Sequence, residues 1–369
     1  MFVFLTLKKS FLIVLTFIIV ICIFSITLYS TSPALPSVSI NEEQVKMIED
    51  ILQTKNKAFM EGDIETIKSL YNLETKLGTW AYEHQMKKMK YLQKWADKQG
   101  IKFTDIKSKI KVRYVKERGS GYRYNFIAST EYNYAYENDP ETVNMFRIGT
   151  YHTLSLDNKD DKWLITKEWY TDPFADSLNL DNIKMDEFKQ YLLNSNPRDL
   201  SNLNKRRVSA VQYADHYCGA AADEEYGYGY NKKYKDYNPL GGDCANFASQ
   251  ILFEGAKFRK TRAWRYERDG SKAWVNAHAF KDYMLNSGRG SLIARGTYNQ
   301  VFKASFKLLP GDFVAYEKGG KITHISVITG ADSKGYALVN CHNTDRYRVP
   351  WDLGWSNKGI KFWFVRVHY

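Results

Sequence analysis

The pattern of apolar and polar positions first separates an N-terminal segment from the rest of the chain. Residues 11–28 form an uncharged apolar run that follows Lys8 and Lys9. At about 1.5 Å rise per residue, this run just crosses a hydrocarbon layer of roughly 30 Å. It is longer than the apolar core of a cleavable signal peptide, which has about 7–15 residues. The residues after it also lack the pattern of small residues that marks a cleavage site. We therefore expect residues 1–35 to form a membrane anchor and linker, with the following domains outside the cell; the alternative is secretion after signal cleavage.

Residues 36–198 change from a helical to a strand pattern. Asn41 is a helix-capping signal, and apolar residues recur at helical spacing over residues 45–52. A second helix is predicted over residues 80–100, and alternation typical of strands follows from residue 101, with a hairpin tip at 157–162. Helices followed by a curved antiparallel sheet predict a cystatin-like or nuclear-transport-factor-like α+β cone. The region shows no paired carboxylates and no histidine cluster, so we expect it to be a spacer or binding domain.

Composition narrows the classes of partner. The chain has 53 Lys+Arg and 41 Asp+Glu, a formal net charge of +12. A basic protein suits an anionic partner, but the charge is spread along the chain without a dense block or a nucleic-acid motif. We therefore expect a solvated basic surface and no nucleic-acid binding; the sequence does not indicate an oligomeric state. Four cysteines among 369 residues also exclude a small disulfide-stapled scaffold.

The clearest chemical signal lies in the third part, residues 199–369. Gly241 and Gly242 permit a tight turn, and Asp243 is a natural N-cap for the helical pattern that follows. This places Cys244 at the first helical position, where free N–H groups and the helix dipole favour a thiolate. A small buried structural cysteine is the alternative for this segment taken alone.

Two later strands supply candidate partners for the cysteine. His324 opens an alternating strand, and the next strand ends with Asn340 and His342 on one face. A helix that carries a cysteine, next to strands that carry a histidine and a polar orienting residue, is the arrangement that nucleophilic cysteine catalysis requires. We expect the Cys244 sulfur and the His324 imidazole to meet in the folded chain.

These segments resemble the "putative amidase domain" family of bacterial surface and spore proteins. The resemblance covers roughly residues 205–369 and rests on Gly-Gly-Asp-Cys-x-Asn-Phe-x-Ser-Gln, Pro-Gly-Asp, His-x-Ser-Val-Ile-Thr-Gly and Cys-His-Asn-Thr-Asp-Arg, in that order. That family is grouped with papain-like cysteine hydrolases, beside the NlpC and CHAP cell-wall peptidases. The resemblance implies a nucleophile helix packed on an antiparallel sheet. It also implies Cys244 as nucleophile and His324 as general base, with His342, or else Asn340, as the orienting residue.

The function implied is that of a cysteine amidase or peptidase acting on peptide or peptidoglycan amides through an acyl-enzyme, with no metal or organic cofactor. The alternatives are a non-catalytic, membrane-anchored wall- or peptide-binding protein and acyl transfer to an amine. The cysteines and histidines lack the spacing usual for zinc ligands. A disulfide between Cys218 and Cys341 is an alternative that the sequence does not decide. The tyrosine-rich stretch 226–237 either lines a groove or, as we prefer, forms a partly exposed loop.

Overall fold

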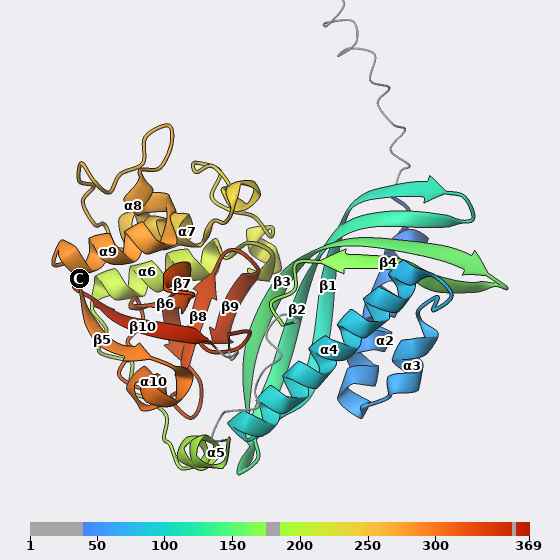
Figure 1. Cartoon of the computed structure of the whole chain (residues 1–369), viewed down its shortest axis with the longest axis horizontal. Coiled ribbons are helices and arrows are strands. Elements are labelled where there is room, and N and C mark those ends of the chain that lie inside the picture. Colours follow the sequence, from blue (N-terminus) through green and yellow to red (C-terminus); the bar gives the residue numbers. More distant parts are fainter. Residues whose placement is uncertain (1–39, 175–184, 356–358) are drawn as a thin grey trace, which may run out of the picture. The chain divides into compact units, whose positions relative to one another are not determined.

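The computed structural model describes residues 40–174, 185–355 and 359–369 (Figure 1). In these residues ten antiparallel strands form one sheet in the order β1-β2-β3-β9-β8-β7-β6-β10-β5, and β4 also pairs with β3. The fold is therefore α+β, as predicted. The sheet runs through both predicted soluble regions, because Arg147–Gly149 of β3 pair with Asp345–Tyr347 of β9.

The first helix begins at the capping residue read from the sequence, and the second predicted helix ends at the expected glycine. The Asn41 side chain accepts a 2.8 Å hydrogen bond from the Gln44 backbone at the start of α2, and left-handed Gly62 ends this helix. The second predicted helix, α4, begins four residues earlier than expected, after Thr75, and ends at left-handed Gly100. These helices are α2 (Glu42–Glu61), α3 (Ile64–Ser69) and α4 (Lys76–Gln99).

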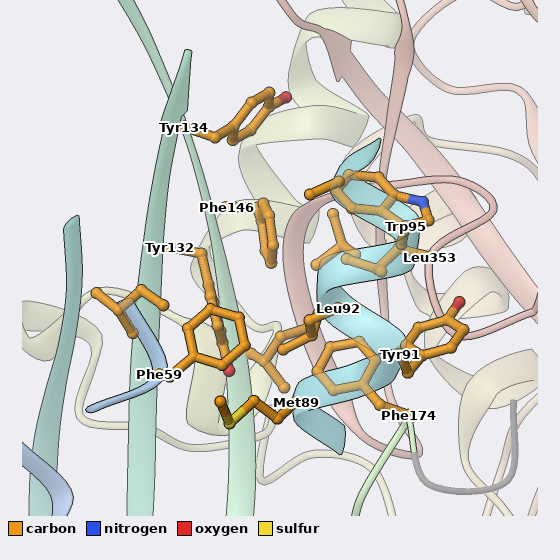
Figure 2. Packing of buried hydrophobic residues seen from close by; sticks show 14 of the residues in the cluster. Phe59, Met89, Tyr91, Leu92, Trp95, Tyr132, Tyr134, Phe146, Phe174 and Leu353 are labelled. Atoms are coloured by element: carbon orange, nitrogen blue, oxygen red, sulfur yellow. The ribbon is translucent and has the colours of Figure 1, made fainter. Parts of the chain in front are cut away.

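Four strands follow as a meander: β1 (Ile101–Arg118), β2 (Gly121–Tyr136), β3 (Asp139–Lys159) and β4 (Lys162–Tyr170). The predicted hairpin tip is the β3–β4 turn, in which Asp160 and Asp161 have positive φ. One face of α4 packs on this sheet: the Trp95 and Phe146 rings are nearly perpendicular, with centroids 6.4 Å apart, and the Phe146 ring stacks on Tyr132 at 4.9 Å (Figure 2). Leu353, from the far end of the chain, joins the same core (Figure 2).

The C-terminal strands carry helices on both faces (Figure 1). Residues of α6, α7 and α9 pack with Ile325 and Val327 in one hydrophobic cluster. On the other face α5 and α10 pack with Tyr316 and Ile328. The helices are α5 (Met185–Leu193), α6 (Lys205–His216), α7 (Cys244–Gln250), α8 (Lys272–Val275), α9 (Ala277–Asn286) and α10 (Tyr298–Ser305). The strands are β5 (Gly290–Gly296), β6 (Phe313–Lys318), β7 (Lys321–Ala331), β8 (Ala337–Cys341), β9 (Asp345–Pro350) and β10 (Ile360–Val367).

Buried polar contacts also join the two parts of the sheet. Lys98 of α4 and Asp352 after β9 form an ion pair with no solvent exposure, and Trp95 donates to the same carboxylate at 3.2 Å. Asp332 accepts hydrogen bonds from Tyr134 and Tyr136 of β2, at 3.0 and 2.7 Å. Because a buried carboxylate is costly without partners, these contacts tie the C-terminal part to the N-terminal helices and strands.

The membrane-spanning helix predicted at the N-terminus is not supported, and neither is the membrane location inferred from it. Within residues 40–174, 185–355 and 359–369, every helix is too short or too polar to cross a bilayer. The apolar run at 11–28 lies outside the described residues.

Candidate active site

The turn before Cys244 has the backbone that its two glycines predict. Gly241 and Gly242 have φ of +113° and +137°, values that residues with a side chain rarely adopt. Gly242 also lies against Asn343: a Cβ atom built on it would be 2.2 Å from Asn343 Nδ2. The Asn343 side-chain oxygen accepts a hydrogen bond from the Asp243 backbone, so the turn is attached to the segment after β8.

Cys244 is the first residue of α7, and the helical path continues through a π-helix to Gly255. The residue is 5% exposed. Burial raises the pKa of the Cys244 thiol to about 12, although hydrogen bonds from the backbone N–H groups of Ile325 and Ala245 lower it. Desolvation therefore outweighs the helix start, and the thiolate expected from the sequence is not the favoured form in this conformation.

The predicted cap of α7 is also arranged differently. Asp243 does not cap the helix with its side chain. Its Oδ1 accepts hydrogen bonds from the Tyr237 backbone and from Asn246 Nδ2, both at 2.9 Å. Its Oδ2 lies 2.6 Å from His342 Nδ1. The carboxylate thus joins the turn, the helix and the end of β8.

His342 is held on every side. Its Nε2 lies 2.7 Å from the Tyr217 carbonyl oxygen. Its ring stacks between those of Tyr230 and Phe247, and each of their centroids lies 3.7 Å from the His342 centroid. Burial alone would lower the pKa of His342, but the hydrogen bond and charge of Asp243 raise it above its ordinary value. A carboxylate and a carbonyl both accept hydrogen bonds, so the arrangement favours the doubly protonated imidazolium. With both nitrogens engaged, His342 contacts Asp243 rather than His324.

His324 lies on β7, directly before Ile325, whose backbone N–H donates a hydrogen bond to the Cys244 sulfur. Its ring lies 5.0 Å from the Trp355 ring and 5.4 Å from the Tyr316 ring. Burial, together with the nearby Arg346 charge, keeps the pKa of His324 well below its ordinary value, so the imidazole is neutral. Its Nε2 atom has no hydrogen-bond partner among the described residues.

The structure does not join Cys244 and His324 by a hydrogen bond within its described residues. Neighbouring residues of a strand point to opposite faces of the sheet. Ile325 packs in the same hydrophobic cluster as Cys244, whereas His324 contacts Tyr316, which belongs to the cluster on the other face. The structure therefore places the two side chains on opposite faces of β7, and the expected contact between sulfur and imidazole is not formed.

Asn340 belongs to a separate polar group on β8. Its Oδ1 accepts hydrogen bonds from Thr329 Oγ1 and from the Arg348 backbone, both at 2.7 Å, and its Nδ2 donates to Asp215 at 2.8 Å. Asp215 in turn pairs with the Arg348 guanidinium at 2.9 Å. These contacts attach α6 to β8 and leave Asn340 without a bond to either Cys244 or His324.

The tyrosine-rich stretch lines a cavity, contrary to our preference for an exposed loop. Tyr228, Tyr230 and Tyr234 form walls of a hollow of about 850 Å³, which also reaches Gly241, Gly242 and residues of β1 and β3. Buried Asp345 fixes two of the walls. It accepts hydrogen bonds from Tyr230 at 2.6 Å and from Tyr151 of β3 at 3.0 Å. The hollow therefore opens beside the turn that carries Cys244.

The remaining cysteines form neither of the sites weighed above. Cys218 and Cys341 are buried and free, as is Cys244, so the Cys218–Cys341 disulfide is absent. In the described parts of the chain, no three His, Cys, Asp or Glu side chains are grouped to hold a metal ion.

Sequence reasoning missed two features. The first is Asp243 as the partner of His342, for which its position next to Cys244 was the available signal. The second is a buried polar cluster in the N-terminal region, which contains one carboxylate and one histidine. There Glu168 lies 2.6 Å from Lys55 and 2.9 Å from the Tyr71 hydroxyl, with His152 nearby. Its members come from α2, β3, β4 and the residues after α3, so no local spacing reveals it.

Comparisons with known proteins find a family match for the C-terminal part of this chain. Residues 204–365 match the model of the family described as "Putative amidase domain". The chain is 31% identical over 211 residues to the uncharacterized protein YjcM of Bacillus subtilis, a match that covers 49% of this chain and 48% of the relative. It is 28% identical over 153 residues to the uncharacterized protein YhbB of the same organism, covering 39% of this chain and 43% of the relative. The chain thus spans less than half the length of these relatives, and no solved structure matches it.

Proposed function

We propose that the protein hydrolyses peptide amide bonds, with Cys244 as nucleophile and His324 as the base. The observation that carries the proposal is the position of the Cys244 sulfur, at the start of α7, beside the backbone N–H groups of Ile325 and Ala245. Backbone N–H groups gathered at one point can stabilise an oxyanion. The match of residues 204–365 to an amidase domain supports the same class of reaction.

The proposed reaction begins with a protonated thiol and a neutral imidazole. His324 Nε2 takes the thiol proton as the sulfur attacks the carbonyl carbon, and nearby N–H groups donate to the oxyanion. The C–N bond then breaks, and the leaving nitrogen takes the proton from His324. A water molecule, deprotonated by His324, attacks the thioester and releases a carboxylic acid and the free thiol.

This sequence requires the His324 imidazole and the Cys244 sulfur to reach the same face of β7, so the backbone of β7 must move as well as the His324 side chain. Catalytic hydrogen bonds are often long or poorly aligned in a free enzyme and tighten when substrate binds, so the free protein's geometry alone does not exclude the role. His342 and Asp243 position the turn and α7 in this mechanism. The peptides of bacterial cell walls are the substrate class that the resemblance implies.

The experiment is a comparison of single-cysteine variants. Cys244→Ala is expected to keep the fold and lose all turnover of a peptide library. Cys218→Ala and Cys341→Ala, which also remove a small buried thiol, are expected to keep turnover. Mass analysis of the wild-type reaction must show an acid and an amine as products. A Cys244→Ala variant with wild-type turnover would rule the mechanism out.

A second function is favoured by one observation. The thiol is buried and makes no hydrogen bond to His324, as in a module that binds peptides without cleaving them. In that case the wild-type chain binds a peptide and returns it intact, and Cys244→Ala binds it equally well. Product analysis of the same reaction separates the two functions.

A further inference from the structure

We infer that the hollow beside the Cys244 turn is a binding groove for an acidic peptide and that the N-terminal region supplies one of its walls. The inference rests on the proposed function, because it names the substrate class of the same site. The groove has a volume of about 850 Å³, within the range of roughly 300–1,000 Å³ typical of ligand sites. It lies between β1 and β3 on one side and residues 228–242 and 343–344 on the other.

Position ties the groove to the chemistry. Gly241, Gly242 and Asn343 line it, and these residues form the turn that leads into Cys244. A peptide in the groove therefore passes next to the segment that holds the sulfur. The residues contributed by β1 and β3 lie outside the part that matches the amidase domain, so recognition on this side belongs to the N-terminal region.

The walls are preorganised aromatic surfaces. The hydroxyl groups of Tyr151 and Tyr230 are bound to buried Asp345, and that of Tyr234 is bound to Glu254 at 2.9 Å. These hydrogen bonds fix the rings, and a fixed tyrosine ring presents a large contact area at little entropic cost. Tyr228 has φ of +55°, an uncommon backbone conformation for a bulky residue and one often found at binding sites.

Charge selects the ligand. Arg113 of β1 and Lys232 are exposed groove residues, and neither forms an ion pair with any described residue. The Arg113 guanidinium lies 5.5 Å from the centre of the Tyr151 ring, which holds it against the wall. Asp236 is the opposing charge in the groove, and its Oδ1 already accepts a hydrogen bond from the Asn238 backbone. The two free cations favour a peptide carboxylate, which a guanidinium binds with two parallel hydrogen bonds.

The test measures binding in the absence of cleavage. Full-length Cys244→Ala is titrated with a fluorescent alanine pentapeptide containing one glutamate, with its glutamine twin and with a neutral amino-sugar oligosaccharide. The glutamate peptide is expected to bind about tenfold more tightly than its twin. Adding Arg113→Ala is expected to remove most of that preference without changing the affinity for the glutamine peptide. The matched control is Lys111→Ala, an exposed cation on the same strand outside the groove, which is expected to keep the preference.

The other possible results distinguish a failure of the groove assignment from a failure of the proposed hydrolase function. Equal binding of the two peptides, binding of the oligosaccharide alone, no binding of any probe, or equal losses in the Arg113 and Lys111 variants would overturn the groove assignment. Selective binding of the glutamate peptide with no cleavage by the wild-type chain upholds the groove and overturns the hydrolase. Cleavage of the glutamate peptide with an unchanged KM in Arg113→Ala upholds the hydrolase and overturns the groove.

Discussion

Asp243 and His342 form a buried ion pair, with 2.6 Å between Oδ2 and Nδ1, although 99 residues separate them in the chain. Asp243 immediately precedes Cys244, so the pair fixes the start of α7 against the end of β8. His342 also contacts the Tyr217 carbonyl and two aromatic rings, which leaves the pair shielded from water. The position of the proposed nucleophile therefore depends on a contact that forms only when the whole C-terminal part is folded.

The first prediction concerns the charge of that pair. The folded-state pKa of His342 lies above the ordinary value of about 6.5, so its stabilising contribution is complete below pH 6.5 and is lost as the pH rises through the folded pKa. His342→Gln is therefore expected to reduce the free energy of unfolding by about 3 kcal/mol at pH 6, the usual scale for a broken buried pair, and by less at pH 9.5. Urea unfolding at both pH values measures the difference.

The control for this prediction is His368→Gln. His368 is exposed and bonds to the Gly288 carbonyl and Ser291 rather than to a carboxylate, so its replacement is expected to cost little at either pH. A loss in His342→Gln that stays constant or grows with pH would show that His342 is neutral in the folded protein.

The second prediction uses the two glycines of the turn as a matched pair. Both have positive φ, but a Cβ at Gly241 meets nothing within 4 Å, whereas a Cβ at Gly242 meets Asn343. Gly241→Ala is expected to cost about 1 kcal/mol for its backbone conformation alone. Gly242→Ala is expected to cost at least about 1 kcal/mol more, because Asn343 must move from its bond to Asp243. Equal losses in urea unfolding would show that Asn343 does not restrain the turn.

The third prediction concerns the reactivity of Cys244. Burial raises the pKa of its thiol to about 12, so little thiolate is present at neutral pH. Alkylation of Cys244 by iodoacetamide, followed by mass spectrometry of its peptide, is expected to be slower than in the urea-unfolded chain at pH 8. Its rate is expected to keep rising beyond pH 10. A plateau below pH 8 that is lost in His324→Ala would instead indicate a preformed thiolate–imidazolium pair.

The elements with local signals could be predicted from the sequence, and those that depend on distant partners could not. Asn41, Gly100 and the Gly241–Gly242 turn act within a few residues, and each has the predicted conformation. The pairing of β3 with β9 depends on segments about 200 residues apart, and no periodicity encodes it. The sequence therefore suggested two separate domains, whereas the sheet continues from one region into the other.

The candidate site shows the same division. Motif and spacing placed Cys244 at the start of a helix and His324 on a strand, and both elements are present. Alternation along β7 gives the face of a side chain only once the register and the covering helices are known. For this reason the sequence could not reveal that Trp355 and Tyr316 contact His324, or that Asp243 pairs with His342.

The last prediction concerns the buried contacts between the two parts of the sheet. Residues 199–369 expressed alone lose the bonds of Asp352 to Lys98 and Trp95, and those of Asp332 to Tyr134 and Tyr136. They also expose the edge of β9 that pairs with β3, and an exposed strand edge promotes aggregation. The fragment is expected to be insoluble or to unfold without cooperativity, whereas residues 40–369 unfold in one transition.

A point variant tests the same interface without truncation. Lys98→Met removes the buried ion pair with Asp352 and is expected to cost about 3–5 kcal/mol of unfolding free energy, whereas exposed Lys102→Met on β1 is expected to cost under about 0.5 kcal/mol. Adding Asp352→Asn to Lys98→Met also removes the buried carboxylate of the pair, so the double variant is expected to recover part of the loss. A fragment 199–369 that unfolds cooperatively, together with a mild Lys98→Met variant, would show that the C-terminal part folds independently and that the shared sheet contributes little to its stability.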